Sequence, residues 1–235
     1  APVNTPGAGL LVGRHMLAHP APQLAAAHIP ANILCTIVSD TLATCEASSI
    51  MGDDELGPWR VLLAEQYASL SRWRDAAQAL QSITPHAARR IPQLSFAQLC
   101  VRVVELWLHD LPSHVAEAEQ AIKRANSAIL DERDNKALVH ELWSYHARVL
   151  AIQHRFMETA ARYMDLPHAD MYAAVYAIIS PPSAQRTSML TRLAQQASAW
   201  PFAQTLRHAA EGRFLRPADL EALAPFLGGV PVQPD

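Results

Sequence analysis

The sequence is poor in glycine, in lysine and in aromatic side chains. It holds eight glycines and 6% aromatic residues, and Lys123 and Lys136 are its only lysines among 19 basic residues. Alanine and leucine are abundant instead, and valine and isoleucine do not gather in the alternating runs that predict strands. These scarcities argue against a strand-rich chain and favour α-helix.

An excess of one charge sign and a long apolar run are also lacking. The formal net charge is −3, and a half-apolar composition with 17% charged residues is typical of a folded chain rather than a disordered one. We therefore expect neither nucleic acid nor a membrane as a partner. Residues 10–17 are the nearest approach to a signal peptide or a membrane span, but they are too few and Arg14 interrupts them.

The sequence has three cysteines, and their spacing does not suggest pairs. Cys35, Cys45 and Cys100 are odd in number and lack the short paired spacing of a zinc site. Reduced, mostly buried thiols are the expectation, and they fit a protein of the cytoplasm and nucleus.

The motifs of several enzyme classes are incomplete. Residues 7–13 follow no predicted strand, so their glycines do not predict a dinucleotide site. His15 and His19 could share a helix face, but Pro20 follows at once and no third ligand lies nearby. The start of a zinc-binding helix at His140 lacks its second histidine, because Ser144 occupies that position. No His-x-His pair, nucleophile elbow or phosphate-binding loop is present. We predict no catalytic residue, no metal ligand and no cofactor.

Helical patterns separated by short turns fill most of the chain. In the clearest turn, residues 51–58, Gly52 is expected to end one helix and Pro58 to begin the next. Ser71 is the expected N-cap of a returning helix. The predicted helical stretches are 23–49 with a break at Pro30, 59–70, 72–83, 94–109, 115–130, 131–152, 156–166, 171–179, 187–197, 202–211 and 217–227.

Three of the returning helices share a packing pattern. Each has a ring at the first position, alanine four residues later and an apolar residue three further on. The sets are Trp73, Ala77 and Leu80, then a weaker middle set of His114, Ala118 and Ala121, then Phe156, Ala160 and Tyr163. Steps of 41 and 42 residues predict a repeat architecture. The alternative is an alanine-rich helical bundle with chance matches.

The predicted fold class is therefore all-α. We expect an α-solenoid of TPR-like or HEAT-like antiparallel helix pairs that forms a right-handed superhelical arm. Packing between pairs is assigned to Trp73, Ala77, Leu80, Ala118, Phe156, Ala160 and Tyr163. If Trp73 is buried between pairs, Trp73→Ala should cost about 3–5 kcal/mol.

Arginines concentrate toward the end of the sequence. Arg186, Arg192, Arg207, Arg213 and Arg216 are candidates for docking an acidic partner in a salt-sensitive way. The alternative is a solvated helix face.

Several segments together resemble a known family. Residues 72–80, 116–125, 147–163, 185–190 and 213–223 are similar, in order and spacing, to subunit four of the COP-nine signalosome, of the PCI-domain family. The resemblance covers residues 59–227 and corresponds to the N-terminal helical-repeat part. It implies a helical-repeat domain over 58–227 leading toward a PCI module. Before residue 59 the match is poor, and the composition there and at the end of the sequence predicts an N-terminal arm with helices over 1–57 and a flexible tail over 228–235.

The resemblance also implies a function. The family's complex removes the ubiquitin-like modifier Nedd8 from cullin-RING ligases through a zinc isopeptidase on another subunit. The fourth subunit is a non-catalytic scaffold and substrate sensor. The implied partners are the other signalosome subunits, including the catalytic isopeptidase pair, and the cullin-RING ligase. A PCI subunit of the proteasome lid and a free-standing repeat module that binds peptides stay open as alternatives.

Overall fold

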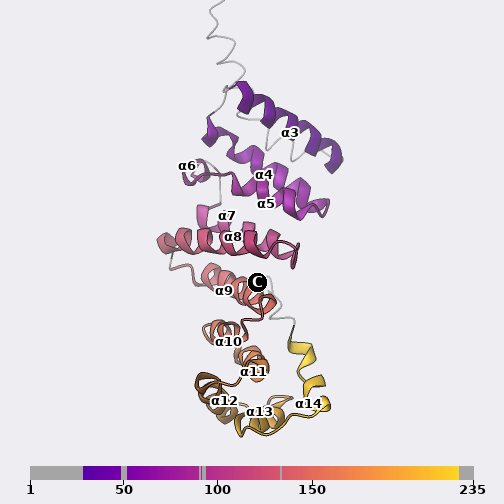
Figure 1. Cartoon of the computed structure of the whole chain (residues 1–235). Helices are drawn as coiled ribbons and strands as arrows, with labels where there is room; N and C mark the ends of the chain where they lie inside the picture. Colours follow the sequence, from indigo (N-terminus) through magenta and orange to yellow (C-terminus); the bar gives the residue numbers. More distant parts are fainter. Residues whose placement is uncertain (1–28, 49–51, 90, 92–93, 133, 228–235) are drawn as a thin grey trace, which may run out of the picture. The chain divides into compact units, whose positions relative to one another are not determined.

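The computed structural model describes residues 29–48, 52–89, 91, 94–132 and 134–227 (Figure 1). The predictions made for residues 1–28 and for the tail 228–235 lie outside the described residues. Every regular element in the described ranges is helical, and none is a strand, which confirms the all-α prediction. The contacts divide the chain into two units, Ala1–Asp131 and Glu132–Asp235, and each is described by itself.

The first unit is a series of helices in which each packs mainly on the next. Its helices are α3 (Ala31–Ser48), α4 (Asp53–Ser69), α5 (Trp73–Gln81), α6 (Pro85–Ala88), α7 (Phe96–Leu108) and α8 (Val115–Ala128), and the 3-10 helix η1 (Ile129–Glu132) follows α8. The main neighbours are α3 with α4, α4 with α5, α5 with α7, and α7 with α8, while the short α6 lies against α4. Nearest-neighbour packing of this kind is what defines a solenoid.

Apolar side chains at helical spacing hold the first unit together. In α3, Leu34, Val38 and Leu42 are nearly or fully buried against Trp59 and Leu62 of α4. Because each of these helices has only one or two apolar stripes, it needs a neighbour on that side to remove the stripe from water. The α7 helix is the most apolar of the unit and is covered by α5 and by α8.

The second unit repeats this arrangement. Its helices are α9 (Lys136–Ile152), α10 (Phe156–Met164), α11 (Asp170–Ile179), α12 (Ala184–Gln196), α13 (Ala203–Ala210) and α14 (Pro217–Glu221), followed by the 3-10 helix η2 (Ala224–Phe226). Consecutive helices from α9 to α13 pack on one another, and η2 returns to α11, where the Tyr176 hydroxyl donates to the Leu227 carbonyl at 2.7 Å. Within each unit the solenoid prediction is confirmed. The right-handed superhelical sense stays a prediction.

Three details near the first turns differ from expectation. Gly52 does not end a helix but precedes α4 as its N-cap, in extended conformation, and its N–H donates to Glu55 Oε2 at 3.3 Å. The helix therefore starts at Asp53 and carries Pro58 in its interior, so Pro58 does not begin it. Ser71 is not the N-cap of α5, because Arg72 occupies that position.

Candidate functional site

The repeat-packing residues occupy the same environment in all three helices predicted to carry them. Ala77 of α5, Ala118 of α8 and Ala160 of α10 are each 0% exposed. The residues three positions further on, Leu80, Ala121 and Tyr163, are buried as well, and the rings at the first positions are partly buried. The small alanine lets the neighbouring helix approach closely, which a larger side chain would prevent.

Each ring at a first position lies against a ring of an adjacent segment. Trp73 stacks on His109, with ring centroids 4.3 Å apart and planes inclined by 21°. His114 lies 5.4 Å from Trp107, and Phe156 lies 6.3 Å from Tyr176. Because Trp73 keeps part of its surface in water, the loss on Trp73→Ala should fall below the 3–5 kcal/mol expected for full burial, at about 1–3 kcal/mol.

The turns before α5 and before α10 are built alike. Ser71 and His154 adopt the left-handed conformation, with φ of 57° and 60°. The next N–H closes the preceding helix: Arg72 donates to the Tyr67 carbonyl at 2.8 Å, and Arg155 donates to the Leu150 carbonyl at 3.0 Å. This Schellman-type ending places each arginine both after one helix and at the N-cap of the next, so the chain reverses within two residues.

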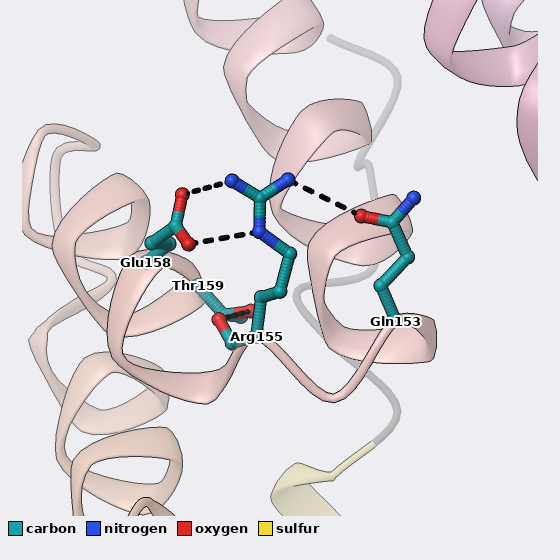
Figure 2. A network of polar contacts seen from close by, with 4 residues as sticks. All are labelled: Gln153, Arg155, Glu158 and Thr159. Carbon is teal, nitrogen blue, oxygen red and sulfur yellow. Dashed lines mark hydrogen bonds and ion pairs between the residues drawn. The ribbon is translucent and has the colours of Figure 1, made fainter.

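Each of these arginines also forms an ion pair with an acidic side chain three residues later, in the first turn of the new helix. Arg72 Nε lies 2.7 Å from Asp75 Oδ2, and Arg155 Nε lies 2.8 Å from Glu158 Oε1. Figure 2 shows the ion pair of Arg155 with Glu158, in which Arg155 also donates to Glu158 through Nη2. The Thr159 hydroxyl donates to the Arg155 carbonyl at 3.1 Å. Exposed pairs add little stability. They do mark the two turns as copies, with Arg155 following Arg72 by 83 residues, about twice the step of the packing pattern.

The turn before α8, the helix with the weaker sequence match, has a different construction. Between α7 and α8 the chain passes through a cis peptide bond at Leu111–Pro112, and the Ser113 N–H donates to the Asp110 carbonyl at 3.1 Å. His114 Nδ1 lies 2.7 Å from Asp110 Oδ2. The packing register of α8 is nonetheless retained at Ala118.

The five arginines proposed for docking do not form one group. Arg186 is turned inward: its Nε and Nη2 donate to the Ala177 and Ile178 carbonyls, each at 3.0 Å, so it ties α12 to the end of α11. The other four, Arg192, Arg207, Arg213 and Arg216, are exposed. Arg213 Nε pairs with Glu211 Oε2 at 2.7 Å. Docking by the exposed members stays a prediction.

Sequence reasoning also missed an inward-facing arginine in the first unit. Arg124 of α8 donates through Nη1 to the Gln81 carbonyl at 2.5 Å and through Nη2 to the Ile83 carbonyl at 2.6 Å, at the end of α5. Its guanidinium also lies over the Phe96 ring, 5.2 Å from the centroid. The only sequence signal was its place beside Ala121 and Ala125 on the apolar side of the helix.

A small apolar cavity lies beside this arginine. The residues that line it include Leu80, Leu99, Cys100, Val103 and Arg124. Burial raises the pKa of the Cys100 thiol to about 11, so the group is a neutral thiol at physiological pH. This thiol therefore lacks the thiolate character that a reactive cysteine needs.

Chemical groups that could form a metal centre do not come together in the described ranges. No group of three or more histidine, cysteine, aspartate or glutamate side chains there could hold a metal ion. Nor is any helix in the same ranges long and apolar enough to cross a membrane.

Comparison with known proteins gives an informative match. No family model matches the chain. COP9 signalosome complex subunit 4 from Caenorhabditis elegans is 29% identical to it over 199 residues, with 77% of this chain and 48% of that protein aligned. The chain is similar to COP9 signalosome subunit 4. This finding confirms the resemblance predicted from the sequence, and the chain spans about half the length of this relative.

The segments that carried the resemblance to COP9 signalosome subunit 4 are structural. Residues 72–80 start at the N-cap of α5, residues 116–125 lie in α8, and residues 147–163 contain the α9–α10 turn. Residues 185–190 lie in α12 and hold the inward Arg186. The resemblance to COP9 signalosome subunit 4 thus rests on helix packing and turn geometry rather than on reacting groups.

Proposed function

We propose that this chain is a non-catalytic scaffold and substrate-sensing subunit of a COP9 signalosome, the complex that removes Nedd8 from cullin-RING ligases. The similarity to COP9 signalosome subunit 4 is the observation that carries the proposal. The repeated packing of α4–α5 and α9–α10 supports it, because rigid helix pairs can hold a partner-binding surface in a fixed shape.

In this role the chain holds partners rather than performing chemistry. Its neighbours are the other signalosome subunits, including the isopeptidase pair that carries the zinc site, and its substrate-side partner is the cullin-RING ligase. Exposed Arg192, Arg207 and Arg216 offer positive charge on α12, on α13 and at the start of α14. Such charges steer an acidic surface toward its site more than they hold it there. The subunit works in the cytoplasm and the nucleus, where cullin-RING ligases act.

Affinity purification of the tagged full-length protein from its own cells tests the assignment. Signalosome subunits and cullins identified by mass spectrometry would support it. Recovery of proteasome base ATPases instead would assign the protein to the proteasome lid. Recovery of neither set would favour a free-standing peptide-binding module and would overturn the proposal.

A functional assay tests whether the protein is needed for removal of Nedd8 from cullins. Cells depleted of the protein should accumulate the Nedd8-modified form of cullins, and re-expression should reverse this. The same assay with Arg192→Glu, Arg207→Glu and Arg216→Glu combined tests the docking surface. We expect weaker cullin binding with the complex still assembled, and a smaller effect at high salt. Unchanged cullin binding would restrict these arginines to a solvated face.

A further inference from the structure

The α3 helix has a second apolar face that no described residue covers. α3 packs on α4 with one side, as Figure 1 shows for this end of the first unit. On the other side Ile33 and Ile37 are 50% and 42% exposed. At helical spacing they share that face with exposed residues that carry small or hydroxyl side chains and one acid: Thr36, Asp40, Ala43, Thr44 and Ala47.

The hydroxyl groups on this face are turned into the helix. Thr36 Oγ1 donates to the Asn32 carbonyl at 3.1 Å, and Thr44 Oγ1 donates to the Asp40 carbonyl at 2.7 Å. With the donors used locally, these threonines present mainly their methyl groups outward. The face is therefore more apolar than its composition indicates.

The exposed side of α12 is a useful contrast. It carries Gln185, Thr187, Arg192, Gln195 and Gln196, as expected for a helix face that stays in water. The outer face of α3 instead repeats apolar residues along its length, which is the pattern of a packing surface.

Asp40 determines what can cover this face. It is the one charged residue among the seven, it lies near the middle of the stripe, and α3 contains no lysine or arginine. A covering segment would remove Asp40 from water, and an unpaired buried carboxylate is strongly unfavourable. The occupant must therefore be apolar and carry one cation opposite Asp40.

We propose that the outer face of α3 is the docking site for residues 10–17 of this same chain, with Arg14 paired to Asp40. This segment reads Leu-Leu-Val-Gly-Arg-His-Met-Leu, so it is apolar with one cation inside it. Arg14 is the only lysine or arginine in residues 1–28, which contain no acid.

The chain between the two partners is long enough. Residues 18–30 connect residue 17 to α3. An extended chain reaches roughly 3.3–3.6 Å per residue, so these residues can span about 40 Å. The 18 residues of α3 are about 27 Å long at 1.5 Å per residue. Residues 10–17 can therefore reach every part of the face.

A zero-length cross-link tests the contact in the full chain. Arg14→Lys keeps the positive charge and supplies an amine that a carbodiimide can join to a carboxylate in direct contact. We expect a cross-link to Asp40 within one chain, identified by peptide mass spectrometry, and its loss in Arg14→Lys combined with Asp40→Asn. Exposed Glu65 of α4 is the matched control carboxylate and should not react above background.

Trypsin supplies a second measurement that needs no change at Arg14. Asp40→Asn and Ile37→Asp should each speed cleavage after Arg14 by about tenfold or more, while Glu65→Gln should leave it unchanged. A cross-link joining two copies would assign the face to self-association and overturn the proposal. So would cross-linking spread equally over Asp40 and Glu65, or cleavage after Arg14 that is equally fast in all variants.

Discussion

The alanines buried between helices should not tolerate a larger side chain, and α8 offers a matched pair to test this. Ala118 is 0% exposed, whereas Ala116, two residues earlier in the same helix, is exposed. Alanine and leucine have nearly the same helix propensity, so Ala118→Leu and Ala116→Leu differ almost only in packing. Three added carbon atoms have no space at Ala118 unless neighbouring helices move apart.

The magnitude follows from the cost of overpacking. Inserting extra methylene groups into a well-packed core typically costs about 1–3 kcal/mol, and a surface substitution stays within about 0.5 kcal/mol. Urea denaturation followed by circular dichroism should give a free energy of unfolding lower by about 1–3 kcal/mol for Ala118→Leu, with Ala116→Leu close to the parent. Ala77→Leu and Ala160→Leu should behave like Ala118→Leu.

The refuting result is equally definite. If the free energies of unfolding of Ala118→Leu and Ala116→Leu differ by less than about 0.5 kcal/mol, the contact between α7 and α8 has room for a larger side chain and alanine is not required there. The buried alanines of the three repeat helices would then not be needed for close helix packing. A changed denaturant slope in Ala118→Leu alone would instead indicate that cooperativity within the repeat array had broken.

Three further predictions concern inward-facing groups. Arg124→Ala should lower the free energy of unfolding by about 2–4 kcal/mol, because two carbonyls lose a charged donor. Arg102→Ala, which breaks an exposed ion pair within its own helix, should lower it by only about 0–1 kcal/mol. Similar values for both variants would contradict the inward role of Arg124. Burial raises the pKa of Cys100 from 9.0 to about 11, so the stability that the neutral thiol contributes is present below pH 9 and is lost as pH rises toward 11. The loss should be no more than about 3 kcal/mol. In a curve of unfolding free energy against pH, measured by urea denaturation, Cys100→Ala should flatten this part. Arg186→Ala should destabilise by about 1.5–3 kcal/mol and Arg192→Ala by less than about 0.5 kcal/mol, which thermal unfolding of the two variants can decide.

Which residue plays which part in a turn was hard to predict from local preferences. Serine is a good N-cap because its hydroxyl can accept a backbone N–H, so Ser71 was the natural choice. The structure instead uses Ser71 as the left-handed residue that ends α4, and Arg72 begins α5 without a side-chain cap. Near the end of α13 the same ending uses Gly212, with φ of 70°, as sequence rules expect. At Gly52 the opposite occurred, because its extended conformation serves as an N-cap.

The sequence by itself determined that the chain is helical, roughly where the helices lie, and which alanines are buried. It could do so because helical periodicity is local: Ala77, Ala118 and Ala160 are identified by neighbours three and four residues away. Only the tertiary structure decided that Arg124 and Arg186 face inward while Arg192 faces water. Arg124 meets carbonyls that lie 41 and 43 residues away in the chain, and nothing in its own helix specifies those partners. An arginine looks the same in sequence whether its guanidinium meets solvent or the end of another helix, so packing between distant segments decides its role.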